Sequence, residues 1–149
     1  MDALLKSANA LMGIAARSVI QVEDRVTSPQ LRVLVFLAAE GTQNLGAIAE
    51  ELRVHPSNAT RTCDKLLKAD LITRSEDPAD RRFVQLDLAP AGRELVESVL
   101  ASRRKALSEV LDRIPDDARA VVLEGFSTFA DAAGASHADG RFLLHLSTS

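Results

Sequence analysis

The sequence predicts a mainly α-helical fold that contains one small β-hairpin. Apolar residues recur at helical spacing from Asp2 to about Glu23 and again through most of the chain after Pro90. Between these regions, residues 71–75 and 83–88 have the composition of short strands, and apolar residues alternate in the second. A charged loop that contains a proline joins the two strands, and we therefore interpret the pair as a hairpin.

The composition is that of one globular domain. With 149 residues, 46% of them hydrophobic, the chain can bury a core of its own. The single cysteine, Cys63, excludes an intrachain disulfide framework and a cysteine-rich zinc site. The three histidines have no spacing that would place two of them on one metal ion. No metal and no cofactor are therefore expected.

A membrane segment is not expected from the sequence. Its apolar runs stay below the roughly 18 residues that are needed to cross a bilayer. The N-terminus also lacks the basic region, apolar stretch and cleavage site of a signal peptide. We expect a cytoplasmic protein without a membrane partner.

Helix signals follow one another from Thr27 to Leu52. Thr27 supplies a cap and Pro29 suits a first helical turn, so a second helix begins here, and Gly41 ends it. After a short polar segment, residues 45–52 place apolar side chains at i, i+3, i+4 and i+7, which predicts a short third helix.

A tight turn at residues 53–56 separates this helix from a fourth, expected from about Pro56 to Ala69. Two helices joined by such a turn form a helix-turn-helix. The core-facing residues of the fourth helix would be Ala59, Cys63, Leu66 and Leu67. Its opposite face carries Ser57, Asn58, Arg61, Thr62, Lys65 and Lys68. Arg, Asn, Ser and Thr can bond base edges and Lys and Ser can hold phosphates, although an ordinary solvated helix face has the same composition.

The loop between the strands, residues 76–82, is rich in charge. We interpret it as a poor folding element whose cationic tip, Arg81 and Arg82, has a function. A helix followed by such a hairpin is the plan of a winged helix-turn-helix, in which the helix enters the major groove and the loop reaches the backbone or minor groove. Residues 53–82 carry a net charge of +2 and the rest of the chain −5, which favours DNA binding on one face.

These segments resemble the MarR family of bacterial transcription regulators. The resemblance rests on 68–74 (KADLITR), 77–82 (DPADRR) and 86–93 (LDLAPAGR), at the family's spacing from a helix-turn-helix. It implies a single domain over 1–149, with a winged DNA-binding region at 28–89 and dimerisation helices at 1–27 and 90–149. It also implies that Arg61 contacts a base, that Arg81 enters the minor groove, and that Arg82 is a phosphate or structural partner.

The sequence departs from the family's pattern at two positions. Ala89 stands where the family commonly has Thr, so the helix that begins at Pro90 lacks a capping hydroxyl, for which Asp87 is a candidate substitute. Asp70 stands where Gly is usual at the end of the fourth helix, and we expect it in a left-handed conformation.

The C-terminal region predicts helices from Pro90 to about Ile114 and from Pro115 to about Ala133, followed by an apolar patch at 142–146. One winged domain does not need two such helices. Their apolar stripes predict a homodimer, which in the MarR family interleaves the first and last two helices. Two recognition helices related by a two-fold axis would read a palindrome.

Several residues have two interpretations. Asp64, Arg74 and Asp80 form either an ion network that holds helix and wing together or ordinary surface pairs. Cys63 is interpreted as a buried structural thiol rather than an oxidant sensor. His55 either contacts a phosphate or packs against the helix start.

Two functions from different classes fit these observations. The first is a dimeric repressor that binds palindromic double-stranded DNA; release by a small-molecule effector is implied by the resemblance. The alternative is a winged-helix protein-interaction module. No catalytic residues are proposed, because the chain has no Gly-rich phosphate loop, no nucleophile turn and no metal spacing.

Overall fold

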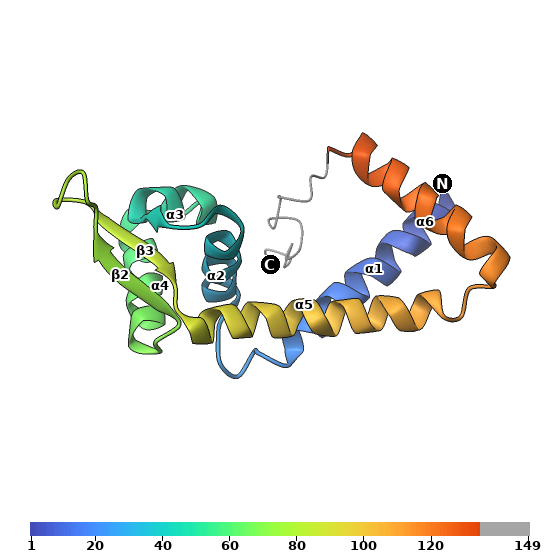
Figure 1. Cartoon of the computed structure of the whole chain (residues 1–149), viewed down its shortest axis with the longest axis horizontal. Helices are drawn as coiled ribbons and strands as arrows, with labels where there is room; N and C mark the ends of the chain where they lie inside the picture. Colours follow the sequence, from blue (N-terminus) through green and yellow to red (C-terminus); the bar gives the residue numbers. More distant parts are fainter. Residues whose placement is uncertain (135–149) are drawn as a thin grey trace.

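The computed structural model describes residues 1–134, which form a lobe and an arm (Figure 1). The elements are α1 (Asp2–Ile20), α2 (Ser28–Glu40), β1 (Gln43–Asn44), α3 (Leu45–Leu52), α4 (Pro56–Lys68), β2 (Ile72–Glu76), β3 (Val84–Leu88), α5 (Pro90–Leu111) and α6 (Asp116–Ala132). The lobe comprises α2, α3, α4 and the sheet. The arm comprises α5, which runs away from the lobe, α6, which turns back after it, and α1. A mainly helical fold with a small hairpin is therefore confirmed.

The sheet has three antiparallel strands in the order β1-β3-β2. The predicted hairpin is β2 and β3, paired from Ile72 opposite Leu88 to Glu76 opposite Val84. Strand β1, in which Gln43 pairs with Leu86, was not expected from the sequence. Two polar residues carry no strand periodicity, so only the neighbouring strand makes this segment a strand.

The helices begin and end close to the predicted residues. Thr27 and Gln30 form a reciprocal capping box at the start of α2, and Gly41 ends that helix at φ 74°. Asn44 caps α3 through its side chain. The first helix ends at Ile20 rather than near Glu23, because residues 21–25 form turns.

The core lies mainly in the lobe. Its buried cluster joins α2, α3, α4, β2, β3 and the first half of α5 to the C-terminal end of α1 and the turn that follows it. The most deeply buried large side chains include Leu34, Leu37, Ile48, Leu66, Leu86 and Leu95. The lobe is thus held rigidly enough to present α4 in one orientation.

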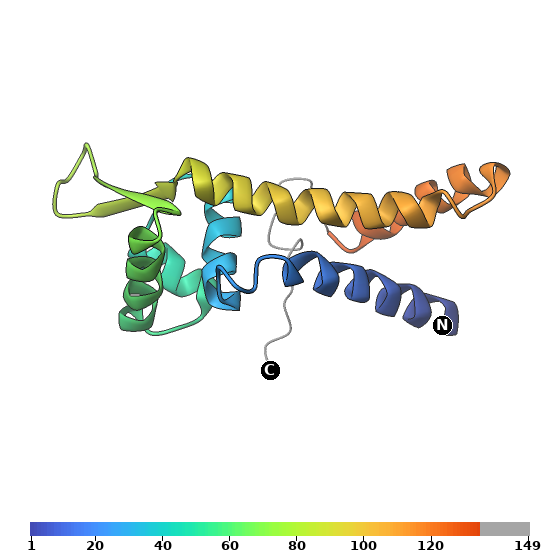
Figure 2. The same ribbon diagram turned by 90° about the horizontal axis from the view of Figure 1, so that it is seen from below.

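Polar contacts attach α1 to α5. Ser18 is 1% exposed, and its hydroxyl accepts from Nη2 of Arg103 at 3.0 Å. Nε2 of Gln21 donates to the carbonyl of Ser98 at 2.9 Å. Burial lowers the pKa of the Arg103 guanidinium from its ordinary value. In Figure 2, the N-terminal part of α1 diverges from α5 beyond this crossing.

The arm leaves much of its apolar surface uncovered. Only the first half of α5 contributes buried residues, and α6 contributes none within the described chain. The exposed large apolar side chains of the arm are Leu4, Leu5, Leu11, Met12, Ile20, Val110, Val121, Leu123, Phe126 and Phe129. The predicted patch at 142–146 lies outside the described residues.

By length and composition alone, α1 is apolar enough to cross a membrane. Unbroken apolar runs in the sequence do not reveal this helix, because Lys6 and Arg17 interrupt it. A single such helix near an N-terminus is weak evidence, since core helices of other proteins satisfy the same test.

Two non-glycine residues adopt left-handed backbone conformations beside α4. Arg53 and Asp70 both have φ 55°, before and after that helix. The expectation for Asp70 is thereby confirmed. Asp87 does not replace the missing cap of α5, because its carboxylate accepts from the Leu88 amide and the Thr42 hydroxyl.

We predict that Asp70→Gly stabilises the protein. A left-handed conformation costs an L-residue about 1–2 kcal/mol, whereas the added freedom of glycine in the unfolded chain costs about 0.4–1 kcal/mol. Urea unfolding should show a net gain of about 0.5 kcal/mol. Asp70→Ala is the matched control, which should bring no such gain because alanine meets the same steric cost in the left-handed conformation. Equal effects of the two substitutions would contradict the backbone explanation.

Candidate nucleic-acid interface

One face of α4 is buried and the other is open to solvent. Ala59, Cys63 and Leu66 are at most 2% exposed and belong to the core cluster, as the sequence predicts. Ser57, Asn58, Arg61, Lys65 and Lys68 are exposed on the other side. An exposed polar face on a rigidly packed helix can enter a major groove and form hydrogen bonds there.

Thr62 is a weaker candidate than its neighbours. Its side chain is half-buried, and its hydroxyl donates to the carbonyl of Asn58 at 3.0 Å. Thr60, which was not among the predicted contacts, is also exposed on α4 between Ser57 and Arg61 in the sequence. The Thr60 hydroxyl donates to the carbonyl of Pro56 at 3.0 Å, so it can still accept a bond from a base. The spacing of three residues from Ser57 was the signal that would have found it.

His55 caps α4. Its Nδ1 accepts from the amide of Ser57 at 3.3 Å and lies 2.8 Å from the Ser57 hydroxyl. This cap uses the lone pair of Nδ1, so it forms with the ring tautomer that has its proton on Nε2. This geometry supports the interpretation in which His55 packs against the helix start, while its exposed ring remains at the end of the polar face.

The loop between β2 and β3 is tied together by its own carboxylates. Asp77 accepts from the amide of Ala79 at 2.8 Å and from Nε2 of Gln85 at 3.0 Å. The amide of Asp77 also donates to the carbonyl of Phe83 at 2.9 Å. The interpretation of this loop as a poor folding element was therefore wrong, since its acidic residues hold its shape.

Arg82 and Arg81 have different environments. Nε and Nη2 of Arg82 donate to both carboxylate oxygens of Asp80, the shortest distance being 2.7 Å. These bonds lower the pKa of the Asp80 carboxyl and raise that of Arg82. Arg81 makes a long ion pair of 3.9 Å with Glu76, between largely exposed side chains. The wing thus leaves Arg81 available to a ligand and engages Arg82 in its own structure.

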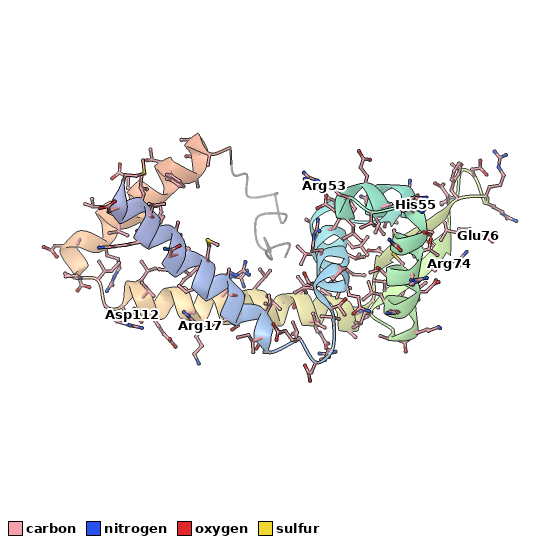
Figure 3. The ribbon with its side chains drawn as sticks, turned by 180° about the vertical axis from the view of Figure 1, so that it is seen from behind. Arg17, Arg53, His55, Arg74, Glu76 and Asp112 are labelled. Atoms are coloured by element: carbon pink, nitrogen blue, oxygen red, sulfur yellow. The ribbon has the colours of Figure 1, made fainter. Side chains whose placement is uncertain are left out.

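The ion network considered for Asp64, Arg74 and Asp80 is not formed within residues 1–134. Asp80 pairs with Arg82 instead, because the two residues lie on one tight turn. Asp64 and Arg74 are exposed on α4 and β2. Figure 3 shows His55, Arg74 and Glu76 at the lobe end of the molecule, whereas Arg17 and Asp112 lie on the arm.

Cys63 lies on the buried side of α4. Burial, with a smaller contribution from the charge of Asp64, raises its pKa to about 11. A thiol with this pKa is almost entirely protonated near neutral pH and is a poor nucleophile. The interpretation of Cys63 as a structural thiol therefore fits its environment.

The geometry defines a class of protein: a winged helix-turn-helix with an exposed polar helix face and a weakly paired arginine on its wing. The model of the MarR family matches residues 26–84. The transcriptional repressor MdtR of Bacillus subtilis is 35% identical over 92 residues, which are 62% of this chain and 59% of MdtR, so the match spans less than two thirds of that relative.

Solved structures extend the likeness to most of the chain. The crystal structure of RV1404 from Mycobacterium tuberculosis has a TM-score of 0.77 and 34% sequence identity, covering 89% of this chain and 91% of that one. A point mutant of MepR from S. aureus, bound to an oligodeoxyribonucleotide, has a TM-score of 0.67 at 15% identity, covering 87% of this chain and 94% of its own, and shares the fold. The chain belongs to the MarR family of helix-turn-helix transcriptional regulators.

We predict that Cys63 resists thiol reagents in the folded protein. With a pKa of about 11, roughly one thiol in a thousand is ionised at pH 8, and the group is also buried. Because the folded pKa lies above the unfolded one, stability from this group is present below about pH 8.5 and declines as the pH rises toward 11. A chromogenic disulfide reagent should label the exposed thiol of a Lys65→Cys variant at once and Cys63 only on unfolding; equal labelling rates would contradict this assignment.

We predict that the Asp80 carboxyl titrates below its ordinary value of about 3.9, because Arg82 stabilises its charged form. The contribution of the pair to wing order is present above that ordinary value and is lost as the pH falls through the lowered pKa. Carboxyl chemical shifts followed against pH by NMR measure the midpoint. Arg82→Ala should return the midpoint toward about 3.9, and an unchanged midpoint would show that the pair does not form in solution.

Proposed function

We propose that the protein is a cytoplasmic, homodimeric repressor that binds palindromic double-stranded DNA and is released by a small-molecule effector. The observation that carries the DNA-binding mode is the pairing of an exposed polar face on α4 with a weakly paired Arg81 on the wing. A helix face supplies base contacts in the major groove, and a wing arginine supplies charge to the neighbouring backbone or minor groove. The repressor role is that of MdtR, carried over as a proposal.

The proposed contacts divide into two groups. Ser57, Asn58, Thr60 and Arg61 form the centre of the base-reading face, with Thr62 at its buried margin. Lys65 and Arg81 supply phosphate and minor-groove contacts, while Arg82 acts through the shape of the wing. Arginine paired with guanine, and asparagine with adenine, are the commonest forms of direct readout.

The proposed second copy covers the arm. Large apolar side chains on α1, the end of α5 and α6 are exposed to solvent. Most of this arm extends away from the lobe that contains α4 (Figure 1). To read two half-sites one DNA turn apart, a two-fold axis through this arm has to hold the two α4 helices roughly 34–36 Å apart. On this proposal, DNA binding is assigned to residues 28–89 and dimerisation to the regions 1–27 and 90–149.

The proposed effector acts on the relative placement of the two lobes. It lowers DNA affinity only by binding better to a conformation in which the α4 helices are wrongly spaced. The junction between the lobe and the arm is the region where such binding would act on this spacing. No catalytic step is proposed, and within the described residues no group of three or more His, Cys, Asp and Glu side chains could hold a metal.

We predict that Arg61→Ala and Arg81→Ala weaken operator binding in different ways. Loss of a base contact at Arg61 should cost about 1–3 kcal/mol and relax specificity at one position of each half-site. Arg81→Ala should weaken binding to all sequences and reduce the salt slope by about 1 per wing. Mobility-shift titrations at several salt concentrations, using DNA that flanks the coding region, measure both effects.

Arg113→Ala is the control for these titrations, because Arg113 is an exposed arginine just beyond the far end of α5. It should leave both affinity and salt slope unchanged. Binding that is insensitive to salt and to Arg81→Ala would contradict the DNA-binding mode. A protein partner captured from a lysate independently of salt would then favour the interaction module.

A further inference from the structure

The backbone of Leu71 joins the end of α4 to the start of α5. Its amide donates to the carbonyl of Leu66, in the last turns of α4, at 3.0 Å. Its carbonyl accepts from the amide of Ala89, immediately before α5, at 3.1 Å. One residue's backbone therefore connects the helix of the base-reading face to the helix of the arm.

Gly92 allows α5 to lie directly on this backbone. A Cβ at Gly92 would stand 2.0 Å from the Leu71 carbonyl oxygen, 3.0 Å from its carbon and 3.2 Å from Cδ2 of Leu88. The first two atoms belong to backbone that hydrogen bonds hold at both ends, so no rotamer change relieves the overlap. Gly125, by contrast, lies in α6 with nothing within 4 Å of its Cβ position among the described residues.

A small displacement here is magnified along the arm. An added Cβ, which would stand 2.0 Å from the Leu71 carbonyl oxygen, needs a shift of roughly 1.5 Å to reach an ordinary contact distance. The 22 residues of α5 span about 33 Å, so a tilt of about 5° at its base displaces its far end by about 3 Å. Because the second copy is proposed to bind along the arm, such a tilt changes the distance between the two base-reading faces.

We propose that Gly92 is a positioning residue that sets the angle between α4 and α5, and thereby the half-site spacing that the dimer accepts. The inference rests on the proposed function for its DNA readout. The angle itself is a property of one chain. Residues on α4 determine which bases are read, whereas the contact between Gly92 and Leu71 determines how far apart the two half-sites are read.

The first measurement needs no DNA. Nitroxide labels are attached to a protein that carries Lys65→Cys and Arg113→Cys, and this protein is diluted with unlabelled chain. Pulsed electron paramagnetic resonance then measures the distance between α4 and the far end of α5. Gly92→Ala should shift this distance, by about 3 Å for a tilt of about 5°. Gly125→Ala should leave it unchanged. A distance that is the same in all three backgrounds would overturn the proposal.

The second measurement titrates palindromes whose half-sites are moved apart or together by one and two base pairs. Gly92→Ala should lose about tenfold or more in affinity for the spacing that the wild type prefers and should prefer another. Discrimination against a base change within a half-site should remain as in the wild type. An equal loss at every spacing would indicate general destabilisation and would overturn the proposal.

Ala89→Gly is a second variant for the half-site titration, to be used if Gly92→Ala does not fold. Glycine is better than alanine at an N-cap, so α5 should still form, while the chain beside the Leu71 bond becomes freer. Its spacing preference should flatten, with the ratio of affinities between neighbouring spacings falling several-fold; an unchanged ratio would overturn the proposal. A wild type that binds no palindrome would refute the proposed function, whereas the nitroxide distances would still decide the role of Gly92.

Discussion

The burial of one side of α4 is the constraint on which the rest of the structure depends. Ala59, Cys63 and Leu66 are almost fully removed from water, so the helix cannot rotate about its axis without exposing them. That restriction decides which side chains face solvent. The surrounding elements serve this placement: α2 and α3 pack against α4, and the sheet continues from its end.

Some charged residues of the wing hold the shape of the loop, and one, Arg81, remains available for binding. The carboxylates of Asp77 and Asp80 satisfy amides and side chains inside the loop, and Arg82 is held by one of them. A loop of seven residues thus keeps a defined shape although it is almost entirely polar. Its net attraction for a polyanion then depends mainly on Arg81, whose ion pair with Glu76 is long and exposed.

Periodicity predicted the helices and the buried face of α4, because each depends on side-chain spacing that is written in the sequence. The left-handed conformation of Asp70 was also predictable, since the family that the sequence resembles usually has Gly at this position after the helix. Strand β1 was not, because its two polar residues become a strand only through pairing with β3. The ion-pair partner of Asp80 was also not predictable, because several basic residues are near it in the sequence. Only the geometry of the turn selects Arg82. Likewise, the half-burial of Thr62 depends on how α4 packs, which spacing alone does not reveal.

The open arm has a consequence for how the chain matures. With no buried residue of its own within the described chain, α6 is a 17-residue helix that depends largely on local backbone hydrogen bonds, and isolated helices of about this length are marginal in water. On the proposed assembly, meeting a second copy is what orders it, so its protection against proteolysis and hydrogen exchange rises with protein concentration. On that proposed assembly, a chain at low abundance has a folded lobe and an uncovered arm, which leaves α6 open to proteases until a second copy binds.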